Sequence, residues 1–197
     1  RSDRFGGLLM YGIPNMKLDK EIVQRRINLM EKLGINFVAN TEVGRDVTAD
    51  DLLKQYDRVV LATGASVPRD LDVPGRHLSG VRFAVDFLTE TTKNVLASDN
   101  KKLGPTLEGK HVLVIGGGDT GNDCIGTAVR LGAASVKQLE ITPEPPEKRL
   151  PTNPWPQYPM IKRVGYGQEE ANFVQDTELT TYATSPTEFI GADSGQV

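Results

Sequence analysis

The sequence has a single cysteine, Cys124, and no long apolar run. One thiol cannot form an intrachain disulfide, and it cannot by itself hold a zinc ion or an iron–sulfur cluster, so we expect no metal site. This cysteine usage is typical of a reducing compartment, and we expect a cytoplasmic protein. The longest apolar runs, such as 112–115, are about four residues long, whereas a membrane-spanning helix needs roughly 20.

An excess of positive charge is also missing. Lys and Arg total 23 against 26 Asp and Glu, which gives a net charge of −3. A nucleic-acid-binding protein usually carries a positive excess, and an anionic membrane would need a polybasic segment. The composition, 38% hydrophobic and 25% charged, is that of a folded chain rather than a disordered one. We therefore expect a small-molecule partner, and neither nucleic acid nor a membrane.

An initiator methionine is absent as well, because the chain begins at Arg1. The residues that follow are polar and glycine-rich, and they do not form the apolar core of a signal peptide. We expect an internal fragment of a longer protein.

Apolar periodicity and turn residues predict alternating helices and strands in the first half. Apolar residues at helical spacing predict helices over 18–33 and 83–96. Thr48 and Asp51 resemble a capping box at the start of a helix that continues to Gln55. Short strands are predicted over 35–38 and 57–63, the second of them buried, and a domain boundary over 97–107.

The second half contains a pattern typical of a βαβ unit. A strand over 110–115, a helix over 119–131 and a strand over 135–141 follow one another. The predicted fold class is therefore α/β and Rossmann-like, with parallel strands. A proline-dense loop over 143–159 follows, and then a polar helix near 168–174. The chain ends in predicted strands over 179–183 and 187–190.

The turn between this strand and helix matches the pattern G-x-G-x-x-G. Its first glycine permits a tight turn, the second allows backbone to approach a pyrophosphate, and the third lets the helix pack close to the strand. Amide groups and the helix dipole at a helix start then favour the phosphates. Two of its residues, Asp119 and Thr120, are also expected to cap the helix. The predicted dinucleotide-binding residues are Gly116, Gly117, Gly118, Asp119, Thr120 and Gly121.

The predicted second strand ends in an acid, Glu140. A carboxylate there accepts hydrogen bonds from the ribose diol of NADH and repels the 2′-phosphate of NADPH. Lys148 and Arg149 follow in the proline-dense loop and could fold back toward a 2′-phosphate. The residues favour NADH and leave NADPH open.

A second nucleotide footprint lies in the first half. The predicted strand over 57–63 ends in Ala62-Thr63-Gly64, and Gly6-Gly7-Leu8 precedes it in the chain. In this order before the glycine-rich turn, the segments resemble flavoprotein reductases with two dinucleotide folds. The resemblance implies that Gly6, Gly7, Leu8, Thr63 and Gly64 contact FAD. It also implies a partial FAD-binding domain over 1–75, a connecting helix and linker over 76–107, and an NAD(P)-binding domain over 108–197.

Longer motifs narrow the resemblance. Residues 6–20, 116–124, 153–157 and 166–171 are together similar to the small (beta) subunit of glutamate synthase. This implies a flavoprotein that takes hydride from NADH or NADPH onto FAD. Electrons then pass through iron–sulfur clusters to the large (alpha) subunit, which makes glutamate from 2-oxoglutarate and glutamine-derived ammonia.

The sequence departs from that family by omission. The cysteine-rich cluster domain and the FAD glycine motif are missing, so the FAD site is incomplete and independent catalysis is not expected. No catalytic side chain is predicted, because in such enzymes the cofactors carry the chemistry. His77 and His111 are expected on the surface, and Cys124 as a small buried hydrophobe.

Other interpretations stay open at this point. The chain could belong to a related reductase that serves a different electron acceptor, such as a dihydropyrimidine dehydrogenase-like or ferredoxin-linked enzyme. It could also be a non-catalytic dinucleotide-binding module, and the severed FAD half could associate as a homo-oligomer. Trp155 is expected either to contact another subunit or to hold the proline-dense loop in place.

Overall fold

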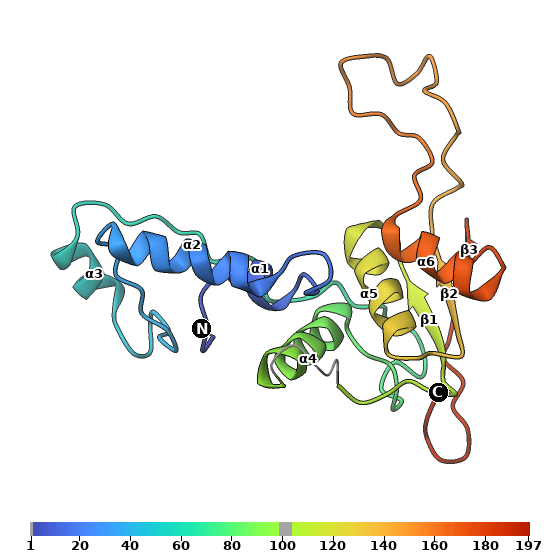
Figure 1. Cartoon of the computed structure of the whole chain (residues 1–197), viewed down its shortest axis with the longest axis horizontal. Helices are drawn as coiled ribbons and strands as arrows, with labels where there is room; N and C mark the ends of the chain where they lie inside the picture. The colour runs from blue at the N-terminus through green and yellow to red at the C-terminus, as the bar shows by residue number, and fades with distance from the viewer. Residues whose placement is uncertain (1, 99–103) are drawn as a thin grey trace. The chain divides into compact units, whose positions relative to one another are not determined.

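A computed structural model describes residues 2–98 and 104–197 (Figure 1). It divides the chain into two compact units, residues 1–70 and residues 71–197. The predicted boundary over 97–107 lies partly outside the described residues. Among the described residues, no helix is long and apolar enough to cross a membrane.

The first unit contains three helices: α1 (Leu8–Tyr11), α2 (Lys20–Lys32) and α3 (Ala49–Gln55). The helix predicted over 18–33 is confirmed as α2, and it begins where the carboxylate of Asp19 accepts a hydrogen bond from Glu21 N at 2.9 Å. The capping box is confirmed at α3, because Asp51 N donates to Thr48 Oγ1 at 3.1 Å and Thr48 N donates to the Asp51 carboxylate.

A buried lysine joins α1 to α2. Lys20 is 3% exposed, and its Nζ donates to the carbonyl oxygens of Leu9 at 3.0 Å, Ile13 at 2.6 Å and Leu18 at 2.9 Å. These three bonds match the three donors of an ammonium group and compensate for its removal from water.

The strands predicted over 35–38 and 57–63 are wrong. Neither segment pairs with another strand within 2–98 or 104–197, and both are irregular. Val60 and Leu61, predicted to be buried, are 87% and 85% exposed. The physical reason is that a strand satisfies its backbone groups only through a neighbouring strand, and none lies beside either segment.

The second unit contains a parallel sheet with helices on one face (Figure 1). Its strands β1 (His111–Ile115), β2 (Ser135–Leu139) and β3 (Thr180–Thr181) lie in the order β1-β2-β3. Its helices are α4 (Ala84–Ala97), α5 (Gly118–Arg130) and α6 (Tyr166–Gln175). The predicted βαβ unit, the α/β class and the helices near 83–96 and 168–174 are confirmed.

The core of this unit lies between the sheet and two helices. Ile125 and Ala128 of α5, Val136 of β2, Ala171 of α6 and Leu179 are each at most 1% exposed. Helix α4 packs against α5. Burial alternates along β1: His111, Leu113 and Ile115 are exposed, whereas the two side chains between them are partly buried toward the core.

Three strand predictions need correction. The second strand of the βαβ unit ends at Leu139 rather than 141, and the strand expected over 179–183 has only two residues. No strand forms over 187–190, where Phe189 N donates instead to the carbonyl of Pro74 at 2.9 Å. The proline-dense segment has no helix or strand, as expected, and forms a long loop between β2 and α6 (Figure 1).

Candidate functional site

The glycine-rich turn carries the chain from β1 into α5. Gly116 has φ +106° and Gly118 has φ +79°, in the left-handed region that favours glycine. A Cβ atom at either position would meet nothing within 4 Å. Helix α5 begins at Gly118, and its N-cap residue, Gly117, has no side chain to accept from the first-turn amides. The turn therefore presents open backbone at a helix N-terminus, which suits an anion.

The acid predicted to bind ribose lies directly over this turn. A Cβ atom on Gly117 would come within 1.7 Å of Glu140 Oε2, so any larger residue there would displace the carboxylate. The other oxygen of Glu140 accepts from Thr142 N at 3.3 Å. Both the turn and Glu140 follow the carboxyl ends of neighbouring parallel strands, the edge at which α/β sheets bind ligands.

The third glycine permits close packing between strand and helix. A Cβ atom on Gly121 would lie 2.7 Å from the carbonyl oxygen of Gly116. That oxygen accepts a hydrogen bond from Gln138 Nε2 at 3.0 Å. The start of α5 is thus held against the turn through Gly121.

No motif in the sequence points to Gln138, which is 1% exposed on β2. Its Oε1 accepts from Gln168 Nε2 at 2.8 Å and from Thr180 Oγ1 at 3.0 Å. The available signal was the period of the strand, because Gln138 shares the buried face of Val136. A buried amide on an apolar strand face requires hydrogen-bond partners. A glutamine at such a position therefore indicates a buried hydrogen-bond network.

Asn122, to which no motif points either, caps α6 from α5. Its Oδ1 accepts from Gly167 N at 3.0 Å and from Gln168 N at 3.1 Å. A Cβ atom on Gly167 would lie 2.3 Å from the Asn122 carbonyl oxygen, so glycine permits this approach. The end of the proline-dense loop is therefore attached next to the glycine-rich turn.

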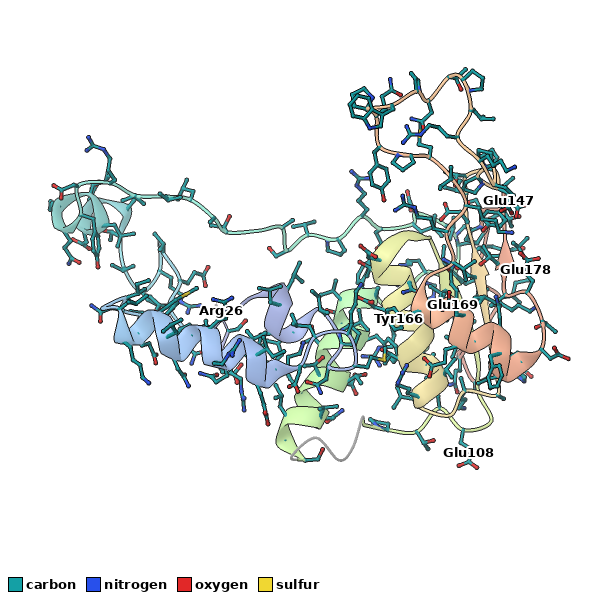
Figure 2. The ribbon with its side chains drawn as sticks, turned by 45° about the horizontal axis from the view of Figure 1, so that its top comes forward. Arg26, Glu108, Glu147, Tyr166, Glu169 and Glu178 are labelled. Atoms are coloured by element: carbon teal, nitrogen blue, oxygen red, sulfur yellow. The ribbon has the colours of Figure 1, made fainter. Side chains whose placement is uncertain are left out.

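The half-buried side chain of Tyr166, labelled in Figure 2, strengthens the same contact by bonding to the buried Asp123. Tyr166 Oη donates to Asp123 Oδ1 at 2.8 Å, and burial together with this carboxylate raises the pKa of Tyr166. Cys124, next in the chain, is 5% exposed, and burial with Asp123 nearby raises its thiol pKa to about 12. The thiol therefore stays protonated near neutral pH and is not a nucleophile, as expected of a buried hydrophobe.

The predicted caps of α5 are wrong. Asp119 and Thr120 lie inside the first turn of the helix and are exposed, because the helix already begins at Gly118. Glycine at the N-cap moves the helix start one residue upstream of the predicted position. His77 and His111 are exposed, as predicted.

An asparagine, and not the tryptophan, organises the proline-dense loop. Asn153 is 3% exposed; its Nδ2 donates to Gln157 Oε1 and to the carbonyl of Tyr158, both at 3.1 Å. The Arg149 guanidinium donates to the carbonyls of Asn153 and Gln157. Trp155 is 83% exposed, so the expectation that it holds the loop in place is wrong.

The residues predicted to contact FAD belong to the first unit. Gly6 and Gly7 precede α1, Leu8 begins it, and Thr63 and Gly64 lie in the irregular segment over 57–70. Gly7 and Gly64 have φ +53° and +67°, with open space around an added Cβ. Within 2–98 and 104–197, no hydrogen bond joins the two segments.

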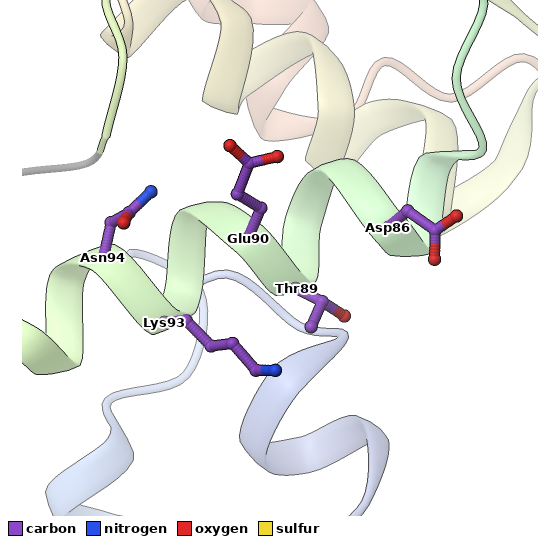
Figure 3. A pocket seen from close by; sticks show the side chains of 5 residues that line it. All are labelled: Asp86, Thr89, Glu90, Lys93 and Asn94. Atoms are coloured by element: carbon purple, nitrogen blue, oxygen red, sulfur yellow. The ribbon is translucent and has the colours of Figure 1, made fainter.

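An open polar pocket lies on α4 (Figure 3). Its lining contains no residue of the glycine-rich turn. The pocket is lined by Asp86, Thr89, Glu90, Lys93 and Asn94.

Comparisons with known proteins agree with the parallel α/β architecture. The family model described as pyridine nucleotide-disulphide oxidoreductase matches residues 20–152. Over 69% of this chain and 34% of the other, the structure is similar to Mycobacterium tuberculosis FprA in complex with NADPH, with a TM-score of 0.52 and 25% identity.

Two curated relatives confirm the resemblance seen in the motifs. The chain is 51% identical to Saccharomyces cerevisiae glutamate synthase (NADH) and 47% identical to the Bacillus subtilis glutamate synthase (NADPH) small chain. All of this chain is covered, but it spans only 9% and 40% of those proteins.

Proposed function

Because this chain belongs to the pyridine nucleotide-disulphide oxidoreductase family, we propose that its residues 108–197 bind NAD(P)H in a glutamate synthase. In that enzyme, these residues would belong to the small subunit or to the equivalent region of a longer chain. The proposal rests on one observation above all, the carboxylate of Glu140 over Gly117 at a helix start.

The residues present fit a dinucleotide. Gly116 and Gly118 leave open space where a pyrophosphate approaches the backbone, and the first turn of α5 supplies amide donors. In this arrangement Glu140 would accept hydrogen bonds from the adenosine ribose. Asp119 and Thr120, exposed in the first turn, lie next to the phosphates in this arrangement.

We propose NADH as the preferred nucleotide. Glu140 would repel a 2′-phosphate, and the Arg149 guanidinium is already bonded to two carbonyls of its own loop. Lys148, the neighbouring cation in the same loop, is exposed. The relatives are named for NADH and for NADPH, so their names do not decide the preference.

When bound, the reduced nicotinamide supplies a hydride and FAD accepts it. The described residues bind and orient: the turn holds the phosphates, Glu140 the ribose, and Gln138 the turn. We assign Gly6, Gly7, Leu8, Thr63 and Gly64 to contacts with FAD in the complete protein. There, iron–sulfur clusters outside this chain would pass electrons to the large (alpha) subunit.

The test is a calorimetric titration of the purified protein with NADH and with NADPH at fixed salt. We expect tighter binding of NADH. Glu140→Gln, which keeps the shape and removes the charge, should weaken NADH by about tenfold and bring the two dissociation constants together, because the ribose hydroxyls then donate to a neutral oxygen instead of a charged one.

The matched control is Glu169→Gln, which removes the same charge from an exposed position on α6 (Figure 2). It should leave both dissociation constants unchanged. Tighter NADPH binding by the unaltered protein would overturn the ribose assignment, and binding of neither nucleotide would overturn the proposed function.

A further inference from the structure

Three consecutive glycines, Gly116 to Gly118, form the phosphate-facing turn. Glycine adopts positive and negative φ almost equally well, so the peptide planes between these residues can rotate with little steric resistance. A plane that turned its carbonyl oxygen toward the phosphates would place negative charge against negative charge. A turn of this composition therefore needs a restraint on its peptide orientation from outside the turn.

The side chain of Gln138 supplies this restraint. It is 1% exposed, and its Nε2 donates to the carbonyl oxygen of Gly116 at 3.0 Å. In a planar trans peptide, the carbonyl of one residue and the N–H of the next point in opposite directions. Holding the Gly116 oxygen inward, toward β2 and Gly121, therefore directs the Gly117 N–H outward.

The orientation of the Gln138 amide is itself determined by two donors. Gln168 Nε2 of α6 and Thr180 Oγ1 of β3 both donate to Gln138 Oε1. With its oxygen occupied in this way, the NH₂ group of Gln138 faces Gly116. Gln168 in turn accepts from Gly165 N at 2.8 Å, so α6 holds the amide that holds the turn.

We propose that Gln138 is a positioning residue for NAD(P)H, which keeps the Gly116 carbonyl away from the pyrophosphate and the Gly117 amide toward it. This inference rests on the proposed function. It adds a buried residue on the neighbouring strand, 22 positions away in the sequence, to the determinants of nucleotide affinity.

The experiment compares Gln138→Met with Gln175→Met in the purified protein. Gln138→Met keeps the length of the side chain and removes its donor, so NADH affinity should fall about tenfold, as for one lost hydrogen bond. Gln175→Met makes the same change on α6, where Gln175 Nε2 donates to the Val136 carbonyl at 3.1 Å and bonds neither Gly116 nor the Gln138 side chain. It should leave NADH affinity unchanged, although both variants lower the melting temperature.

Nuclear magnetic resonance reports directly on the backbone conformation of the turn. In ¹⁵N-labelled protein without nucleotide, Gln138→Met should shift or broaden the Gly117 amide resonance, and Gln175→Met should leave it in place. If Gln138→Met does not fold, Gln168→Met takes its place, because it frees the Gln138 amide to rotate. That variant should weaken NADH about threefold, a fraction of a full hydrogen bond.

Unchanged NADH affinity in the folded Gln138 variant, or an equal loss in Gln175→Met, would overturn the positioning role. Unchanged affinity in Gln168→Met would do the same if that variant is the one that folds. Absence of binding in the unaltered protein is a different result, because it overturns the proposed function and the positioning role with it.

Discussion

The two units of this chain respond differently to similar sequence patterns. In residues 71–197, the strand around Val136 pairs with neighbours on both sides, and Val136 is 1% exposed. In residues 1–70, the more apolar segment around Val60 and Leu61 stays irregular and exposed. Helices form in both units, as α2 and α5 show. A helix completes its hydrogen bonds within its own segment, whereas a strand depends on a partner elsewhere in the chain.

The largest expected effect tests whether a core position of the second unit contributes more to the free energy of unfolding than an exposed position of the first. Ile125→Ala removes a side chain with no exposed surface from the core of the second unit and should lower the free energy of unfolding by about 3 kcal/mol. Val60→Ala removes a β-branched side chain from the first unit, but that side chain is exposed, and the change should stay within about 0.5 kcal/mol. Chemical denaturation measures both. Comparable losses would show that Val60 is buried in the folded protein and would break the comparison.

A smaller effect compares two glycines that serve the two proposed nucleotide sites. In Gly121→Ala, the new Cβ would lie 2.7 Å from a backbone oxygen, which should cost about 2 kcal/mol of stability and weaken NADH binding. In Gly64→Ala, φ +67° is strained but the space is open, so the cost should be about 1 kcal/mol.

Melting curves and NADH titrations of the two variants separate these cases. Gly64→Ala should leave NADH affinity unchanged, since its assigned contact is with FAD. Normal NADH binding by Gly121→Ala would show that close packing at the third glycine is unnecessary.

The smallest expected effect concerns the capping box at Thr48, which the sequence predicts and the structure contains. Thr48→Ala removes the side-chain acceptor at the start of α3 and should destabilise the first unit by about 1 kcal/mol. Thr48→Ser keeps the acceptor and is the control. The loss should disappear in Thr48→Ser, and helical circular dichroism during denaturation measures it. An equal loss in both variants would mean that the threonine methyl group, and not the cap, stabilises the helix.

The sequence alone predicted what depends on neighbours along the chain. The capping box at Thr48, the periodicity of α2 and the strand–glycine–helix order before α5 all involve residues a few positions apart. It also predicted the class of the site, since the glycine spacing is itself a local pattern. The start of α5 was missed by one residue, because glycine at the N-cap carries no side-chain signal.

Tertiary structure decided which segments pair and which side chains meet the turn. Gln138 contacts Gly116 across 22 positions, and Asn122 contacts Gly167 across 45. The same holds for the strands, because 57–63 has strand composition but no neighbour in the described chain. Hydrogen bonds within a helix connect residues four apart, so a local sequence pattern is enough to predict them. Strand ladders and buried amide networks connect residues that only folding brings together.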